Sequence, residues 1–157
     1  ALVVSMVMFG FIGGVTGVLQ GMQQLNMIVH NTLMVPGHFH ATVVAGTTVA
    51  FMGLAYYVVP LISQRQLVGR SWAQIQPYLY GFGLLVLITG MWFSGRLGAA
   101  RRDWDITAAG TAFPPVYSAA LDFTLALLGI GAILAVIGGA IFVILMVLTL
   151  LVGKKQA

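Results

Sequence analysis

Residues 36–62 read PGHFHATVVAGTTVAFMGLAYYVVPLI, the run that indicates most clearly what kind of protein this is. It contains no Asp, Glu, Lys or Arg. It is also longer than the roughly 20 residues that an α-helix needs to cross the apolar core of a bilayer. Pro36 opens the run, at a position where the missing N–H of proline costs a helix nothing. The stretch is therefore predicted to be a membrane-spanning helix with His38 and His40 near its start.

The composition of the whole chain agrees with a membrane protein. Of its 157 residues, 60% are hydrophobic and only 6% are charged, and the mean hydropathy is +1.02. Such a low charge content excludes an ordinary soluble domain. The net charge of +4 comes from few and scattered basic residues, so no binding of nucleic acid is expected. The absence of cysteine excludes disulfides, thiolate metal sites and cysteine nucleophiles.

Apolar segments that could cross the membrane lie at about residues 1–19, 36–62, 77–97 and 116–150. We therefore predict an all-α fold, an integral membrane helical bundle with four transmembrane helices, in which residues 1–157 form a single domain. The last segment is longer than one crossing requires, so it must protrude, tilt or break, and Gly138-Gly139 is its expected weak point. The chain begins at Ala1 without a methionine, which suggests a processed, split or incomplete polypeptide.

Basic residues predict which end of the bundle faces the cytoplasm. Residues 63–72 contain Arg65 and Arg70, the C-terminus contains Lys154 and Lys155, and neither region contains an acid. Cytoplasmic loops of membrane proteins carry an excess of Lys and Arg. We therefore expect both regions on the cytoplasmic side of a prokaryotic inner membrane that the chain crosses several times.

Residues 20–35 and 98–113 are then expected to face outward, and the histidines would lie near the outer surface. This side nevertheless carries basic residues, which the simplest form of the rule does not predict. They require negatively charged partners. The charged residues of the outward side are Arg96, Arg101, Arg102, Asp103 and Asp105.

The spacing of the histidines predicts two separate centres. A helix turns about 100° per residue, so His38 and His40 point to roughly opposite faces and cannot converge on one ion. Three histidines fall within residues 30–40, and ionisable side chains in a membrane are rare and usually functional. Interfacial hydrogen bonding is the simpler interpretation of a single histidine. Imidazole also suits haem iron, which takes protein ligands along its axis.

The run HNTLMVPGHFH at residues 30–40 closely resembles the tenth helix of the catalytic subunit of haem-copper oxidases. It looks most like the B-type branch, which has His-Asn-Thr where the mitochondrial-like branch has His-Asp-Thr. Upstream, GGVTGV at residues 13–18 is similar to the end of the ninth helix of that family. Downstream, Arg101-Arg102 follows the third span as an Arg-Arg pair follows the eleventh helix, although Ala100 stands where proline is common. The resemblance implies that the bundle is part of a subunit of twelve or more helices.

The resemblance also implies roles for individual residues. His38 would be the catalytic residue, as the proximal ligand of the high-spin haem iron, and His40 would be an axial ligand of the low-spin haem iron. His30 would lie above the propionates of the high-spin haem. Asn31, also a candidate cofactor-binding residue, stands where many relatives have an aspartate that helps to hold a magnesium ion, so a magnesium site is not among the predictions. Arg101 and Arg102 would bind the haem propionates, because guanidinium groups match the geometry of carboxylates.

The implied function is that of a terminal respiratory oxidase, which reduces O2 to water with proton pumping. Its cofactors would be two haems and a copper ion (CuB) held by residues outside this chain. The expected partners are the N-terminal part of subunit I, a subunit II with a copper or haem electron-entry domain, a cytochrome c or cupredoxin donor, and the lipid bilayer.

The histidine run weighs against a purely structural assembly subunit, and two other functions remain open at this stage. One is a nitric oxide reductase of the same superfamily, although Pro36, Gly37 and Phe39 favour the oxidase. The other is a non-catalytic haem-binding membrane subunit. That class usually pairs histidines between helices at long spacings, whereas this chain has them almost adjacent.

Overall fold

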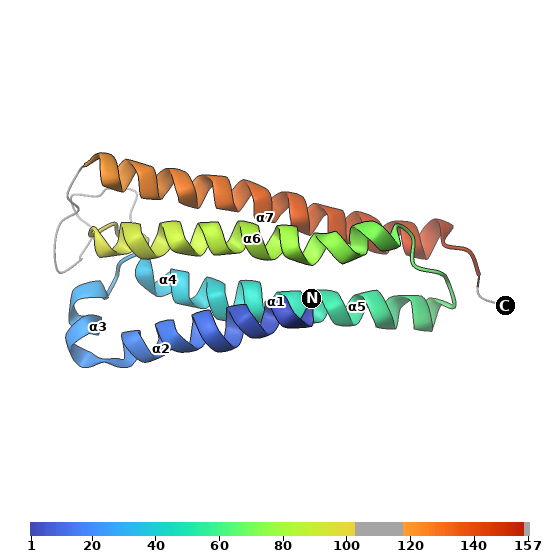
Figure 1. Cartoon of the computed structure of the whole chain (residues 1–157), viewed down its shortest axis with the longest axis horizontal. Helices are drawn as coiled ribbons and strands as arrows, with labels where there is room; N and C mark the ends of the chain where they lie inside the picture. The colour runs from blue at the N-terminus through green and yellow to red at the C-terminus, as the bar shows by residue number, and fades with distance from the viewer. Residues whose placement is uncertain (103–117, 156–157) are drawn as a thin grey trace.

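The computed structural model describes residues 1–102 and 118–155 of the chain. Within these ranges it is a bundle of helices, as expected, and it contains four helical segments that are long and apolar enough to cross a membrane. They cover Leu2–Gly21, Met34–Ser63, Arg70–Arg96 and Ala119–Val152. Figure 1 shows these segments lying roughly along one common direction.

The first membrane segment changes its helical geometry partway along its length. It consists of α1 (Leu2–Met6), the π-helical turns η1 (Val7–Gly13) and α2 (Gly14–Gly21). The short helix α3 (Gln23–Val29) follows at the end of the bundle. The Ser5 hydroxyl donates to the carbonyl oxygen of Gly46 in the next segment at 2.7 Å, so a hydrogen bond joins the two segments inside the bundle.

The second membrane segment has the same construction. It consists of α4 (Met34–Phe39), the π-helical turns η2 (His40–Thr47) and α5 (Thr48–Ser63). The widened turns η1 and η2 pack against each other. Gly46 makes this possible, since a Cβ atom there would lie 2.5 Å from the Cβ of Phe9. Widened turns of this kind often occur at functional sites, and η2 begins at His40.

The third and fourth membrane segments form a tightly packed pair, α6 (Arg70–Arg96) and α7 (Ala119–Val152), which lie side by side (Figure 1). Glycines bring their backbones together. A Cβ atom at Gly90 would lie 2.5 Å from the backbone nitrogen of Leu128, and one at Gly131 would collide with that of Leu87. Small residues allow this close approach where no hydrophobic effect drives helices together.

The α7 helix runs without interruption through Gly138-Gly139, so the expected weak point is wrong. Gly138 lies against Tyr80 instead, where an added Cβ atom would meet the Tyr80 backbone at 2.9 Å. The low helix propensity of Gly138-Gly139 is offset by the close packing of α7 against α6. The α6 helix also begins earlier than the apolar run, at Arg70, and includes Pro77 in its interior.

Backbone contacts between distant segments close the two ends of the bundle. At one end the amide of Gln66 donates to the carbonyl of Lys154 at 2.8 Å. Both regions with basic residues and no acids therefore lie at the same end. At the other end the amide of Leu33 donates to the carbonyl of Ala99 at 2.9 Å. The residues around His30 and Arg101 share this second end.

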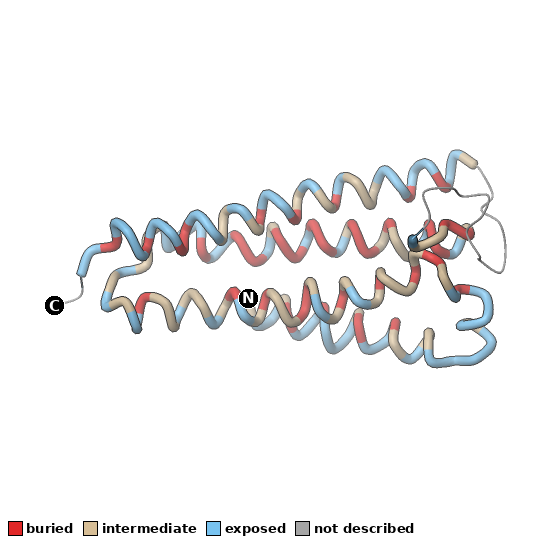
Figure 2. Tube along the Cα trace, turned by 180° about the vertical axis from the view of Figure 1, so that it is seen from behind, coloured by how far each residue is buried: buried red, intermediate tan, exposed pale blue. Residues whose placement is uncertain are grey.

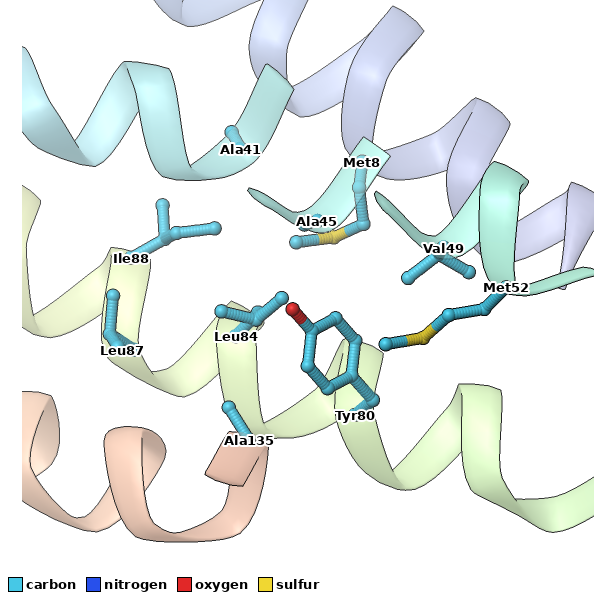
Figure 3. Packing of buried hydrophobic residues seen from close by; sticks show 10 residues of the cluster. All are labelled: Met8, Ala41, Ala45, Val49, Met52, Tyr80, Leu84, Leu87, Ile88 and Ala135. Atoms are coloured by element: carbon cyan, nitrogen blue, oxygen red, sulfur yellow. The ribbon is translucent and has the colours of Figure 1, made fainter. Parts of the chain in front are cut away.

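The largest apolar cluster lies between the first three membrane segments and α7 (Figure 3). Among the described segments α6 is the most enclosed, whereas α5 and α7 expose many large apolar side chains along their outer faces (Figure 2). Exposed apolar faces of this extent are those that lipid or further helices cover. The buried residues of the cluster are Met8, Ala41, Ala45, Val49, Met52, Tyr80, Leu84, Leu87, Ile88 and Ala135.

Candidate functional site

The His38 imidazole points from α4 toward α2, where a threonine holds it. Its Nδ1 atom lies 3.0 Å from Oγ1 of Thr16. The same hydroxyl donates to the carbonyl oxygen of Gly13 at 3.0 Å. A hydroxyl has a single hydrogen, so the Thr16 oxygen accepts from His38 once that hydrogen is directed at Gly13. The His38 ring then carries its proton on Nδ1 and leaves a lone pair on Nε2.

Gly17 provides the space that the His38 ring occupies. A Cβ atom at Gly17 would lie 3.0 Å from Cε1 and 3.6 Å from Nε2 of His38. The His38 ring would have to shift by a few tenths of an ångström to admit even one added Cβ atom at this position of α2. Thr16 and Gly17 together form a cradle that fixes the direction of the ring.

His40 is held by its own helix. Its Nδ1 atom lies 2.8 Å from the carbonyl oxygen of Pro36. A carbonyl only accepts, so this hydrogen bond requires a proton on Nδ1. The lone pair of His40 is then also on Nε2. Hydrogen bonds from Nδ1 that leave Nε2 for the metal are the usual arrangement of metal-binding histidines.

Phe39 lies between the two histidines in the chain and is mostly exposed in the described bundle. Its ring centroid is 5.5 Å from that of His38, and 55% of its surface is exposed. His38 faces α2, whereas His40 makes its contact along its own helix. The two imidazoles therefore have different surroundings, and their binding of two separate centres stays a prediction.

Asn31 and Arg101 meet at the end of the bundle near the histidine helix. The Arg101 amide donates to the Asn31 carbonyl at 2.9 Å, and its Nη2 donates to Asn31 Oδ1 at 3.1 Å. Asn31 adopts a left-handed backbone conformation with φ 62°. Among the described residues Arg101 Nε is buried without a hydrogen-bond partner. This N–H is a donor for a further acceptor such as a carboxylate.

His30 and Arg102 lie at the same end of the bundle as Asn31 and Arg101. His30 is exposed and lines a cavity of about 350 Å³ with Gln23, Asn26 and Met27. Arg102 is exposed at the edge of the described range, and Asp103 and Asp105 lie outside it. Within the described ranges no three His, Asp or Glu side chains form a metal-binding group. These ranges therefore supply no complete ligand set for a copper ion.

The residues present fit axial binding of iron by two imidazoles. Each histidine can offer an unprotonated Nε2, the two rings lie in separate surroundings, and the buried Nε–H of Arg101 can donate to an anionic acceptor. Haem combines an iron that binds imidazole with carboxylates that bind arginine. The donor set on this chain agrees with that chemistry.

Comparison with known proteins identifies the class. Residues 1–134 match the family described as cytochrome c and quinol oxidase polypeptide I. The chain belongs to this family, and its expected membership of the haem-copper oxidase catalytic subunits is confirmed.

Individual relatives agree with this assignment. Subunit 1 of cytochrome c oxidase from Thermus thermophilus is 31% identical over 110 residues, which are 68% of this chain and 19% of that protein. Subunit 1 of the cytochrome bo(3) ubiquinol oxidase from Buchnera aphidicola is 28% identical over 131 residues, 81% of this chain and 18% of that protein. The chain thus spans about a fifth of the length of these relatives.

A solved structure shows the same arrangement of helices. A heme-copper terminal oxidase dimer determined by cryo-EM contains a chain that superimposes with a TM-score of 0.83 at 27% identity. The match covers 99% of this chain and 27% of that one. The fold described above is therefore part of a larger helical subunit in that protein.

Two features of the site escaped the sequence analysis. Thr16 and Gly17 were included in a family-like run, but nothing in the sequence indicates that they contact a ring more than twenty positions away. The π-helical turns were also missed. A threonine within a glycine-rich membrane helix is the only signal, and such hydroxyls usually bond to their own backbone.

Proposed function

We propose that this chain contributes to the catalytic subunit of a terminal respiratory oxidase that reduces O2 to water. The observation that carries the proposal is the pair His38 and His40, each with Nδ1 engaged and Nε2 left for iron. Membership of the cytochrome c and quinol oxidase family supports it. No observation favours the nitric oxide reductase or a non-catalytic haem-binding subunit.

The two histidines would have different roles. His38 would hold the iron of the high-spin haem and His40 that of the low-spin haem, as the family resemblance implies. The haems supply electron storage and the binding of O2. The protein would contribute by keeping each imidazole in one tautomer and one orientation, and the hydrogen bonds of His38 to Thr16 and of His40 to Pro36 support this.

Arg101 would bind a haem propionate through its buried Nε–H, while its Nη2 stays on Asn31. Arg102 would provide a second positive charge nearby. Asn31 is a neutral ligand and already accepts a hydrogen bond from Arg101, so a magnesium site is not part of the proposal. His30 would lie toward the outward surface, above the high-spin haem.

The proposal also covers the type of oxidase, its partners and its orientation in the membrane. We propose a cytochrome c oxidase type of the B-type branch, with proton translocation and a copper ion held by residues outside this chain. The N-terminal part of subunit I, subunit II and a cytochrome c or cupredoxin would be its partners. In a prokaryotic inner membrane, residues 63–72 and the C-terminus would face the cytoplasm, and residues 20–35 and 98–113 would face outward.

Oxygen consumption by the complete enzyme tests the function. We expect His38→Ala to abolish O2 reduction and the binding of carbon monoxide, because the iron that binds these gases loses its protein ligand. Phe39→Leu is the matched control, since it changes the neighbouring side chain without removing an imidazole, and it should retain both haems. Unchanged O2 reduction in His38→Ala would contradict the proposal.

A separate turnover assay identifies the electron donor. Reduced cytochrome c, a reduced cupredoxin and a quinol are offered in turn to the wild-type enzyme. Turnover with cytochrome c or a cupredoxin and none with quinol is the expected result. Turnover with quinol alone would place the chain with the quinol oxidases of the family.

A further inference from the structure

We propose that Thr16 is a positioning residue for His38, whose hydroxyl sets the tautomer of the ring and its strength as an iron ligand. The inference rests on the proposed role of His38 and goes beyond it, because it assigns a task to a residue on another helix. Thr16 is 7% exposed and lies in α2, and the two residues are joined by the 3.0 Å contact between Oγ1 and Nδ1.

The hydrogen bonds around Thr16 allow two arrangements, and only one suits iron. In the first, His38 Nδ1–H donates to Thr16, and the Thr16 hydroxyl donates to the carbonyl of Gly13. In the second, the hydroxyl donates to Nδ1, so the proton of the neutral ring is on Nε2 and the Gly13 carbonyl loses that donor. Iron at Nε2 requires the first arrangement. The Gly13 carbonyl, which can only accept, favours the same one.

The local backbone holds the hydroxyl in place. In a helix the Oγ1 atom of threonine can bond to the carbonyl three residues earlier, which restricts its side-chain rotamer. Thr16 makes this bond to Gly13, the last residue of η1. Its lone pairs therefore point away from its own helix. Gly17, one residue further along, leaves the space that the His38 ring fills.

The chain of bonds strengthens His38 as a ligand. Hydrogen bonds in series polarise one another, so the Gly13 carbonyl makes the Thr16 oxygen a better acceptor for Nδ1–H. A stronger hydrogen bond at Nδ1 raises the electron density of the ring and the basicity of a metal-binding histidine. Among the described residues the Nδ1 atom of His40 bonds instead to Pro36 of its own helix, four residues earlier. Of the two histidines, His38 is therefore the one whose ring hydrogen bond depends on the position of α2.

Resonance Raman spectroscopy of the reduced complete enzyme tests this directly through the stretching frequency of the bond between iron and His38. Thr16→Val keeps the shape of the side chain but removes the hydroxyl, and we expect the frequency to fall. Thr16→Ser restores a hydroxyl and should restore the wild-type frequency. Thr42→Val is the matched control: the Thr42 hydroxyl donates to the backbone carbonyl of His38 at 3.2 Å and does not contact its ring.

An unchanged frequency in Thr16→Val with a full complement of haem would overturn the inference. If Thr16→Val does not assemble, Gly17→Ala serves in its place, because the added Cβ would displace the ring from an intact hydroxyl. The frequency should again fall, and an unchanged value would again overturn the inference. Failure of the proposed function is a different result: the stretching band of the wild-type enzyme would persist in His38→Ala.

Discussion

Arg101 binds Asn31 twice, through a backbone hydrogen bond of 2.9 Å to its carbonyl and a side-chain hydrogen bond of 3.1 Å to its Oδ1. The segment that leads into the histidine helix is thereby attached to the end of α6. Asn31 adopts φ 62°, a left-handed conformation that asparagine tolerates and most residues avoid. One residue thus makes the turn and orients an arginine.

Replacement of Asn31 separates these two tasks. Asn31→Gly keeps the left-handed backbone but loses Oδ1, whereas Asn31→Ala loses Oδ1 and also strains the turn. We expect Asn31→Ala to be less stable than Asn31→Gly by about 1 kcal/mol, the usual cost of a left-handed conformation for a residue with a Cβ atom. Thermal unfolding of the purified enzyme measures this difference. Equal stability of the two variants would show that the turn is not strained by alanine.

The approach of α6 and α7 predicts a difference between two neighbouring glycines. A Cβ atom at Gly131 would collide with the backbone of Leu87, whereas one at Gly129 meets nothing within 4 Å. Gly131→Ala should therefore destabilise the enzyme by about 1–3 kcal/mol, as overpacking usually does. Gly129→Ala, the matched control on the same helix, should not. Thermal inactivation of the two variants checks the prediction, which fails if they lose activity at the same temperature.

A buried glutamine joins three helices and predicts a measurable coupling. Gln76 is fully buried on α6, its Nε2 donates to the Gly138 carbonyl of α7 at 3.0 Å, and its Oε1 accepts from the Tyr56 hydroxyl of α5 at 3.0 Å. Gln76→Leu should cost about 1–3 kcal/mol, because it leaves buried polar groups without partners.

A double-mutant cycle isolates the bond between Gln76 and Tyr56. Gln76→Leu combined with Tyr56→Phe should cost less than the sum of the single changes, by about 0.5–3 kcal/mol. The midpoints of thermal or denaturant unfolding give the required values. Strict additivity would show that this hydrogen bond contributes nothing to stability.

The proposed orientation can be tested with introduced thiols, because the chain has no cysteine. In an enzyme cleared of cysteine elsewhere, Asn26→Cys should react with a membrane-impermeant maleimide in intact cells. Gln66→Cys lies at the opposite end of the bundle and should react only after the membrane is opened. The reverse pattern of labelling would show that the basic end faces outward.

Much of the fold was predictable from the sequence, because a membrane-spanning helix is recognised by a long apolar run without charged residues. The exact start of α6 was not. Residues 70–76 are polar in part, so they fall outside the apolar run that begins at Pro77, yet they continue the same helix. The continuous course of α7 through Gly138 depends on Tyr80 of another helix, and a contact of that kind is not encoded in local pattern.

For the candidate site the sequence predicts that the two histidine rings point apart, and their roles as iron ligands stay predictions. The spacing of His38 and His40 follows from helix geometry alone and predicted two centres. The hydrogen bond between Thr16 and His38 could not be predicted, because it depends on how α2 packs against α4. The widened turns that bring these helices together have no simple sequence signature.

Absorption spectra of two variants of the complete enzyme show whether His38 and His40 bind different irons. His38→Ala should lose the haem that reacts with carbon monoxide and keep the low-spin signal. His40→Ala should lose the low-spin signal and keep the site that binds carbon monoxide. Loss of the same signal in both variants, or of neither, would contradict the account.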